Sequence, residues 1–355
     1  MQIDILTSQE AAVLQELIAA SSHIVITCHK SPDGDALGSS LAWAEYLRSL
    51  GKEPMVVVPD AFPDFLQWLP NTQTVVRYDK RPDYVDLLLK TADLVFCLDF
   101  NESSRVDAMQ TALNETKARK VVIDHHLLPS AESEPAADAA GEGVADERLL
   151  ISHPDLSSTS ELVFRIVWQL GSFEAMPKSW AIQVYCGMMT DTGGFTFNSS
   201  RPEIYFIIGQ LLTKRINKDK IYRKVYNNYS SWAIRLRGHI MCNKLNVFEE
   251  QHASYFAISK KEMHDFHFIK GDAEGLVNEP LRIKNMRLSI SLREDDRVPN
   301  LVWVSLRSVD DFPCNKMAEQ YFNGGGHLNA SGGRLNCSLE EAEQIARKAI
   351  MEFKG

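Results

Sequence analysis

The sequence predicts an α/β fold in which a parallel, doubly wound sheet is joined by a helical linker to a smaller α+β domain with a mixed sheet. In the first part of the 355-residue chain, continuous apolar runs alternate with helical segments, which is typical of a parallel sheet covered by helices on both faces. After about residue 246, shorter segments alternate between apolar and polar residues, as half-buried strands do. We therefore expect domains at 1–225 and 247–355, with a linker helix at 226–246.

The individual elements follow from the same patterns. Buried strands are predicted where the apolar runs are continuous, at 24–28, 55–58, 94–98 and 121–123. Alternating strands are predicted at 254–258, 286–292 and 301–306. Helices are predicted from their apolar faces at 9–21, 37–50, 180–189, 203–226 and 231–246. Ser158 and Glu161 fit a capping box, which predicts a further helix that begins there.

Composition limits the class of partner. The formal net charge of −9 makes the chain a poor non-specific binder of long duplex nucleic acid, although a short phosphorylated substrate still fits. No apolar stretch approaches the length of a membrane span, and the N-terminus lacks a signal pattern. The six cysteines are scattered without a CxxC pair, which favours free thiols in a reducing cytoplasm. We expect the basic stretch 214–224 to be mainly a solvated face, and 131–147 to be a surface loop without assigned chemistry.

Acidic and imidazole side chains follow the predicted buried strands. His29, Asp33 and Asp35 follow the first run, Asp99 the third, and Asp124-His125-His126 the fourth; Asp191 ends a predicted helix. Each has an ordinary explanation when taken alone: a turn for the Asp-Gly pair, a helix cap for Asp99, surface exposure for the two histidines, and a turn cap for Asp191. Together they lie where an open α/β sheet binds its ligands, beyond the carboxyl ends of the strands.

This set of side chains favours a metal site with two ions. Imidazoles and carboxylates without thiolates suit Mn²⁺ better than a structural zinc ion. The carboxylates are too many for one ion but suit two ions about 3.5–4 Å apart that share a bridging carboxylate. Such a pair lowers the pKa of a bridging water and stabilises the oxygens of an in-line attack on phosphorus. The sequence thus predicts phosphoester hydrolysis.

The order of these motifs resembles that of the DHH phosphoesterase superfamily. His29-x₃-Asp33-x-Asp35, then Asp99, then Asp124-His125-His126, then Asp191-Thr-Gly-Gly follow its motifs one to four. The C-terminal segment 324–333, Gly-Gly-Gly-His-Leu-Asn-Ala-Ser-Gly-Gly, resembles the signature of the DHH-associated substrate domain. The resemblance covers nearly the whole chain. It is nearest to the RecJ-like members of NrnA type, which act on nanoRNA and on 3′-phosphoadenosine-5′-phosphate (pAp).

The resemblance implies a role for each residue of the first domain. Six side chains would bind two Mn²⁺ ions, or Mg²⁺ in their place: His29, Asp33, Asp35, Asp99, His125 and Asp191. His29 and Asp33 would hold one ion; Asp35, His125 and Asp191 would hold the other; and Asp99 would bridge them. Asp124 would orient its neighbours, and His126 would lie near the scissile phosphate. Asp99, Asp124 and His126 are therefore the expected catalytic residues.

In the second domain, the resemblance implies that the substrate is held by Arg307, Gly324, Gly325, Gly326 and His327. Glycine lets backbone N–H groups converge on an anion, and a guanidinium fits phosphate oxygens. The alternatives are a plain glycine turn and an exposed arginine at the rim of a strand. Some relatives have a basic residue after the DHH triplet, whereas this chain has Leu127, so one phosphate contact is absent.

The expected function is an Mn²⁺-dependent phosphoesterase that hydrolyses short oligoribonucleotides and pAp. The alternative within the enzyme class is hydrolysis of cyclic di-AMP or of its linear product pApA. A nucleotide-binding regulator with an inert site is a third hypothesis, which the complete set of ligands disfavours. The glycine-rich signature favours a nucleotide over pyrophosphate or polyphosphate. The expected partners are short single-stranded oligonucleotides or phosphorylated adenosine nucleotides, in the cytoplasm and away from membranes, and a homodimer is compatible with the sequence.

Overall fold

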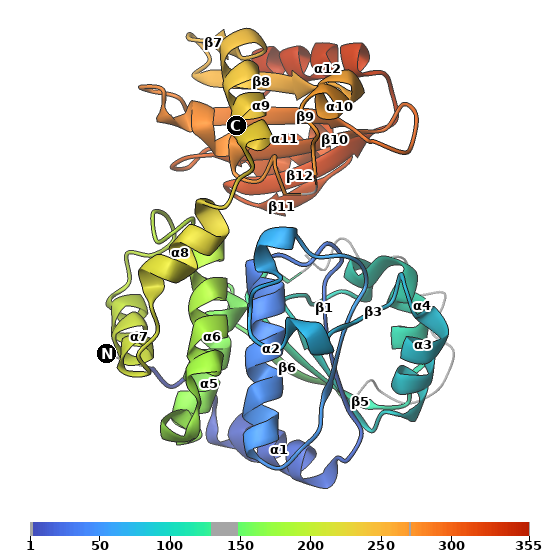
Figure 1. Cartoon of the computed structure of the whole chain (residues 1–355), viewed down its shortest axis with the longest axis vertical. Coiled ribbons are helices and arrows are strands. Elements are labelled where there is room, and N and C mark those ends of the chain that lie inside the picture. The colour runs from blue at the N-terminus through green and yellow to red at the C-terminus, as the bar shows by residue number, and fades with distance from the viewer. Residues whose placement is uncertain (1–2, 129–147, 270, 355) are drawn as a thin grey trace. The chain divides into compact units, whose positions relative to one another are not determined.

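The computed structural model describes residues 3–128, 148–269 and 271–354, and the predicted loop 131–147 lies outside them. The chain divides into two compact units, Met1–Asn228 and Tyr229–Gly355 (Figure 1). We call them the first and the second unit. The helix α9 (Ser231–Asn243) belongs to the second unit. A linker helix that spans 226–246 between two domains stays a prediction.

The first unit is built on a six-stranded sheet in which every pair of neighbouring strands is parallel, as predicted. Its strands are β1 (Ile24–Cys28), β2 (Met55–Val58), β3 (Val76–Arg77), β4 (Leu94–Leu98), β5 (Arg119–Asp124) and β6 (Arg148–Ser152). The sequence indicated β1, β2, β4 and β5 because these strands are almost wholly buried. It missed β3, which has only two residues, and β6, which is mostly half-exposed.

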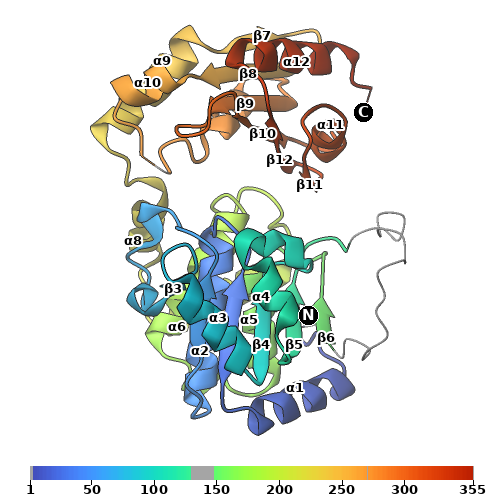
Figure 2. The same cartoon turned by 90° about the vertical axis from the view of Figure 1, so that its right-hand side faces the viewer.

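Helices cover both faces of this sheet, which makes it doubly wound. Ile24 and Ile26 of β1 pack into one hydrophobic cluster, and Val25 between them packs into another, because successive side chains of a strand point to opposite faces. The first cluster is completed by α1 (Ser8–Ala20), α2 (Gly34–Ser49), α5 (Thr159–Gln169) and α6 (Lys178–Asp191). The second is completed by α3 (Pro82–Thr91) and α4 (Gln110–Glu115), which cross the sheet in Figure 2.

The order of the strands, β3-β2-β1-β4-β5-β6, reverses between β1 and β4. From β1 the chain builds outward through β2 and β3, and from β4 it builds outward in the other direction. The loops that leave β1 and β4 therefore diverge at their carboxyl ends, where open α/β sheets bind their ligands. The motifs after Cys28 and Leu98 consequently meet at this point.

The prediction of one helix over 203–226 is wrong. The structure has two helices, α7 (Pro202–Thr213) and α8 (Lys218–Tyr226). Arg215 lies between them with a φ of 57°, a left-handed conformation that no α-helix continues through. Asn217 then caps α8, since its side chain accepts a hydrogen bond from the Lys220 N–H at 2.9 Å. The chain turns at a position that has no glycine to mark it.

The second unit contains a mixed sheet, as predicted, in the order β11-β12-β10-β9-β8-β7. Only β8 and β9 are parallel among its neighbouring strands in the described residues. The strands are β7 (Asn246–Phe248), β8 (Ala253–Ile258), β9 (Leu288–Glu294), β10 (Val302–Ser308), β11 (Gly325–His327) and β12 (Ala330–Leu335). Its further helices are α10 (Lys260–Asp265), α11 (Cys314–Tyr321) and α12 (Leu339–Glu352). Among the described residues, no helix combines the length and the apolar character needed to cross a membrane.

Candidate active site

His29 and Asp33 lie in the loop between β1 and α2. Asp33 is the N-cap of α2, and its Oδ1 accepts hydrogen bonds from the N–H groups of Asp35 and Ala36 at 2.9 and 3.0 Å. This leaves Oδ2 of Asp33 3.9 Å from Nε2 of His29. The other ring nitrogen of His29, Nδ1, lies 2.7 Å from the carbonyl oxygen of Lys30. The cap thus fixes the carboxylate, and the carbonyl fixes the imidazole.

Asp35 is fully buried and is held by the first turn of α5. Its two carboxylate oxygens accept hydrogen bonds from the N–H groups of Thr159 and Ser160 at 2.7 and 2.9 Å. A helix N-terminus carries a partial positive charge, which stabilises a carboxylate there. Burial nevertheless raises the pKa of Asp35 well above its ordinary value, and the charge of Asp99 adds to this increase. Asp35 therefore needs a further positive charge to remain ionised.

Asp99 follows β4 and lies at the centre of the site. Its Oδ2 is 3.4 Å from Nε2 of His29, and its Oδ1 is 3.6 Å from Nε2 of His125 and 3.7 Å from Nδ1 of His126. The Thr159 hydroxyl donates to Oδ1 at 2.9 Å. Burial alone would raise the pKa of Asp99, but the side chains of His29, His126 and His125 outweigh burial and lower it. The carboxylate is therefore an anion between three imidazoles.

The backbone of Asp99 has a φ of 66°, in the left-handed region that few residues other than glycine adopt. A conformation of this kind costs about 1–3 kcal/mol and is usually found at functional sites. The Asp99 N–H donates to the carbonyl oxygen of Ile123 at 3.1 Å, which ties the turn to β5. Asp99 is therefore not a simple helix cap. It lies in an uncommon turn, which this hydrogen bond stabilises.

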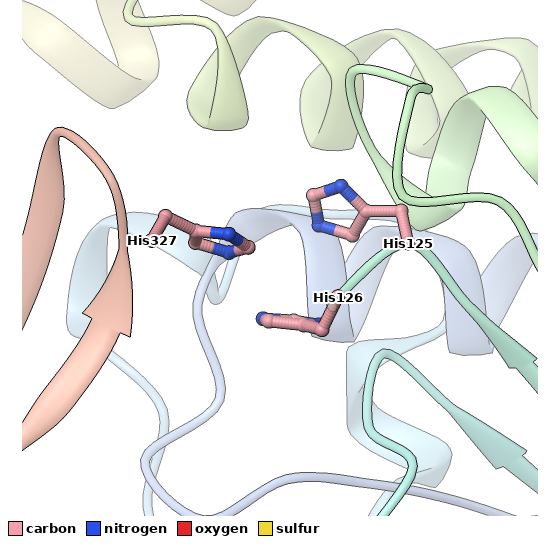
Figure 3. Close-up of side chains that lie close together, drawn as sticks. All are labelled: His125, His126 and His327. Atoms are coloured by element: carbon pink, nitrogen blue, oxygen red, sulfur yellow. The ribbon is translucent and has the colours of Figure 1, made fainter. Parts of the chain in front are cut away.

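Asp124 and His126 form a pair at the end of β5. Nδ1 of His126 lies 2.7 Å from Oδ1 of Asp124, and the Asn101 side chain donates to Oδ2 at 2.7 Å. Burial lowers the pKa of His126, but the hydrogen bond to Asp124 outweighs burial and raises it. Figure 3 shows the rings of His125 and His126 side by side, with centroids 4.8 Å apart. Asp124 therefore orients His126 and favours its protonated form.

His125 faces three carboxylates. Its Nε2 lies 3.2 Å from Oδ2 of Asp191, which ends α6, 3.6 Å from Asp99 and 3.9 Å from Asp35. Its Nδ1 lies 3.3 Å from the carbonyl oxygen of Leu156, so Nδ1 is the nitrogen that carries hydrogen. His29 has the same orientation, with Nδ1 toward a carbonyl oxygen and Nε2 toward Asp33 and Asp99. A neutral imidazole would place a lone pair against carboxylates, so each site requires a proton or a metal ion.

The donor set therefore fits metal cations. Side-chain ligand atoms that lie within 4.8 Å of one another form one group of His29, Asp33 and Asp99 and another of Asp35, Asp99 and His125. The groups share Asp99, and Asp191 adjoins the second through His125. Imidazole nitrogen and carboxylate oxygen are ligands that suit Mn²⁺ and Mg²⁺ better than thiolate-binding ions. All eight predicted residues of the first unit thus lie together; their individual roles stay predictions.

Glu161 is a buried residue of this site whose surroundings the sequence did not indicate. The Ser158 hydroxyl accepts from the Glu161 N–H at 3.0 Å, as the capping box predicts. The Glu161 carboxylate does not return to Ser158. Its Oε1 accepts from Arg165 at 2.7 Å, and its Oε2 accepts from the Ser157 N–H at 2.9 Å and from Arg201 at 2.9 Å. Two arginines offset the free-energy cost of burying this carboxylate. The carboxylate of Glu161 in turn fixes the turn that positions Thr159 and Ser160.

In the second unit, the register of the sheet places Arg307 and His327 on one face. Arg307 of β10 pairs with Ala330 of β12, and Ala330 pairs with His327 of β11. Directly paired residues of antiparallel strands present their side chains on the same face. Arg307 and His327 are therefore two strands apart, about 10 Å, on one surface. This spacing suits two contacts to one nucleotide.

The glycines beside this surface differ in their surroundings. The Gly324 N–H donates to the carbonyl oxygen of Ala318 at 3.2 Å, so it already has an acceptor. A Cβ at Gly324 would lie 1.8 Å from the Gly332 carbonyl oxygen, which explains why glycine is needed there. Gly325 and Gly326 continue into β11, and Gly326 has a φ of 140°. The Gly324 N–H thus has an acceptor within the unit, and the contact of the Gly324, Gly325 and Gly326 amides with an anion stays a prediction.

Comparison with known proteins agrees with this geometry. The N-terminal domain model of the DHH family matches residues 23–188. The solved structure of an exopolyphosphatase-related protein from Bacteroides fragilis is 44% identical, with a TM-score of 0.88 over 98% of both chains. The bifunctional oligoribonuclease and PAP phosphatase NrnA of Thermus thermophilus is 27% identical over 345 residues, 96% of this chain and 93% of that relative. The cyclic-di-AMP phosphodiesterase GdpP of Geobacillus thermodenitrificans is 25% identical over 351 residues, and this chain spans 49% of it.

The family match and the relatives named NrnA indicate a hydrolase of the phosphoesterase class, and carboxylates and imidazoles at the switch point of the sheet suit such an enzyme. The chain belongs to the DHH family. The resemblance seen in the order of the motifs is therefore confirmed, and the structure brings the same motifs together at one edge of the sheet.

Gly187→Ala is expected to displace Asp35. A Cβ at position 187 of α6 would lie 1.9 Å from Oγ of Ser160 and 2.7 Å from Oδ1 of Asp35. We expect the free energy of unfolding to fall by about 1–3 kcal/mol, as in other overpacked cores, and the affinity for Mn²⁺ to fall with it. Thermal unfolding and calorimetric titration with Mn²⁺ measure the two effects.

Gly209→Ala is the matched control, because a Cβ at this position of α7 meets no atom within 4 Å. Alanine is the better helix former by about 1 kcal/mol, so this variant should unfold at the same temperature or higher and bind Mn²⁺ normally. If both variants behave alike, the close packing of α6 does not position Asp35.

Proposed function

We propose that the protein is a two-metal phosphoesterase that hydrolyses short oligoribonucleotides and pAp, with Mn²⁺ as the working ion. The observation that carries this proposal is the position of Asp99, whose carboxylate belongs to both groups of ligand atoms. A shared carboxylate is what a pair of ions 3.5–4 Å apart requires, by the usual spacing of two-metal sites. His29 and Asp33 would hold one ion; Asp35, His125 and Asp191 would hold the other.

The residues of the chain divide the work of hydrolysis. When bound, the ions lower the pKa of a water and neutralise charge on the phosphate oxygens. The chain holds the ligands in place before substrate arrives, through the cap of Asp33 and the α5 N–H groups that hold Asp35. The hydrogen bond to Asp124 orients His126 and raises its pKa, so this imidazole, when protonated, would attract the scissile phosphate and stabilise the charge that develops on it. Arg307 and His327 would bind the rest of the substrate.

The substrate class is supported by the relatives and by the second unit. The Thermus relative, which this chain covers almost end to end, is named for oligoribonuclease and PAP phosphatase activities. Arg307 and His327 share one face of the sheet and offer a cation and an imidazole to a phosphorylated nucleotide. Cyclic di-AMP is the second candidate, because the Geobacillus relative is named for its hydrolysis. The same proposal places the protein in the cytoplasm, since all six cysteines are free thiols.

Asp99→Ala is expected to cost more activity than the loss of any other single ligand. The carboxylate adjoins both groups of ligand atoms, so its removal should release both ions. We expect kcat to fall at least about 1000-fold, equivalent to about 4 kcal/mol, and bound manganese to fall from two ions per chain to less than one. Elemental analysis after gel filtration and steady-state kinetics give the two values. Asp64→Ala, at an exposed residue of the same unit, is the control; near-normal turnover of Asp99→Ala would refute the bridging role.

The affinity for Mn²⁺ is expected to rise with pH. Burial lowers the pKa of His29, but the hydrogen bond to Asp99 and the charge of Asp33 outweigh burial and raise it to about 9. Nε2 must lose its proton before it can bind a metal ion, so protons compete with Mn²⁺ below that pKa. Affinity should increase by up to about tenfold per pH unit between about pH 6 and pH 9 and then level off. Titration calorimetry in buffers of different ionisation enthalpy measures both affinity and proton release; an affinity independent of pH would contradict the assignment of His29.

A panel of substrates tests the function directly. With Mn²⁺, we expect pAp and oligoribonucleotides of two to five residues to be turned over at least about tenfold faster, by kcat/KM, than cyclic di-AMP or polyphosphate, since only the former are linear nucleotides with a free end. Arg307→Ala should mainly raise KM, because a distant phosphate contact binds substrate and transition state alike. Chromatography of products from an oligoribonucleotide labelled at its 5′ end, in Mn²⁺ and in Mg²⁺, gives the direction of attack. Preference for polyphosphate or for cyclic di-AMP would replace the proposed substrate.

A further inference from the structure

We propose that the first unit carries a second nucleotide site, separate from the candidate metal ligands, in the pocket between α6, α7 and α8. The pocket has a volume of about 730 Å³, which accommodates a nucleoside monophosphate. Aromatic side chains form one part of its lining, and the beginning of α8 forms another. None of the predicted metal ligands lines it. The proposal therefore goes beyond hydrolysis and does not depend on it.

The aromatic part of the pocket suits a nucleobase. Tyr205 and Tyr222 line it with 55% and 44% of their surface exposed. Phe195 also lines it, in contact with Tyr185 at a centroid distance of 5.5 Å. The Tyr222 ring packs closely on Gly194 at this wall, since a Cβ there would lie 3.2 Å from the ring. Bases stack on exposed aromatic rings of this kind without regard to sequence.

Tyr185 supplies an unsatisfied polar group at the same place. Its side chain is only 5% exposed and lines the pocket, yet its hydroxyl has no hydrogen-bond partner among the described residues. Burial, with the nearby charge of Asp219, raises the pKa of Tyr185 to about 12, so the hydroxyl keeps its proton at neutral pH. The hydroxyl is not among the buried side-chain atoms that lack a partner, so it is the accessible end of an otherwise buried side chain at the pocket wall. A ligand that accepts a hydrogen bond, such as a base edge or a phosphate, would satisfy it.

The beginning of α8 suits the phosphate. Asn217 caps the helix by accepting from the Lys220 N–H, whereas the N–H groups of Lys218 and Asp219 have no acceptor in the described part of the chain. Asn217, Lys218 and Asp219 all line the pocket. The Asp219 carboxylate is paired with Lys218 at 2.7 Å, which offsets its charge. Open N–H groups at a helix N-terminus bind anions, and the helix dipole favours them.

The basic stretch 214–224 is thus not a uniform solvated face. Lys214 lies over the Phe173 ring at 4.4 Å and Lys224 over the Trp68 ring at 4.7 Å, so these two cations already contact aromatic partners. Lys218 and Arg223 face the pocket, and the Arg223 guanidinium makes no hydrogen bond or ion pair with any described residue. An unpaired guanidinium beside a helix N-terminus and exposed tyrosines is the chemistry that recognises a phosphorylated nucleoside.

Equilibrium titration of the full chain with AMP, in excess chelator to prevent metal-dependent turnover, tests the site. Arg223→Gln and Tyr222→Ala should weaken binding about tenfold, by loss of a phosphate contact or a stacking face, and Tyr185→Phe about fivefold. Lys220→Gln is the matched control, since Lys220 is a cation of the same helix that does not line the pocket; it should stay within about twofold. No saturable binding, or equal loss in Arg223→Gln and Lys220→Gln, would overturn the proposal.

Two further titrations decide the source of the nucleotide. Adenosine without phosphate should bind at least about tenfold more weakly than AMP if α8 holds the phosphate. The diadenylate pApA should compete with AMP if the site also binds the end of an oligonucleotide. If the site binds only free nucleotide, AMP should bind and pApA should not compete. Both results support the pocket. A dimer in light scattering that Tyr222→Ala converts to a monomer, together with no AMP binding, would assign this face to a second copy and sink the proposal. Failure of hydrolysis in Mn²⁺ leaves this binding measurement unaffected.

Discussion

The site depends on keeping two buried carboxylates, Asp35 and Asp99, ionised next to each other. In water the repulsion between two such carboxylates is weak, but inside a protein the charge of each raises the free energy needed to ionise the other. Different groups stabilise the two charges. The first N–H groups of α5 donate to Asp35, and the imidazoles of His29 and His125 lie beside Asp99. Thr159 joins the two, since its backbone N–H reaches Asp35 while its hydroxyl reaches Asp99. Negative charge remains uncompensated here, and metal cations held by these side chains would neutralise it.

The topology of the sheet explains how these groups come together. The reversal of strand order between β1 and β4 separates the loops that follow them, which opens a place for α5 to begin against both. Close helix packing then completes the arrangement. Gly38 of α2 and Gly187 of α6 leave no room for a side chain: a Cβ at Gly38 would lie 2.7 Å from the Gln183 carbonyl oxygen. The two helices therefore approach through their backbones, and α6 ends with Asp191 beside His125.

The parts of the fold that could be predicted are those in which one local signal decides the outcome. Continuous apolar runs indicated β1, β4 and β5, because strands buried on both faces admit little else, and the residues that follow them were correctly placed at one edge. The break at Arg215 could not be predicted, since neither glycine nor proline marks it. Nor could the partner of Asp35 be predicted, because Thr159 and Ser160 lie more than 120 residues away and act through backbone N–H groups, which every sequence has.

The same contrast applies to charge. A net charge of −9 argues against a long nucleic acid as partner. Net charge, however, is a sum over parts of the surface that differ in local charge. Much of the negative charge that matters is buried at Asp35, Asp99, Asp124 and Glu161, where imidazoles, arginines and N–H groups compensate it. Compensated charge of this kind contributes little to the field outside the protein. Under the two proposals made above, local cations such as Arg223 and Arg307 would set what binds, and they would favour small phosphorylated ligands over a polyanion that has to contact the acidic surface along its length.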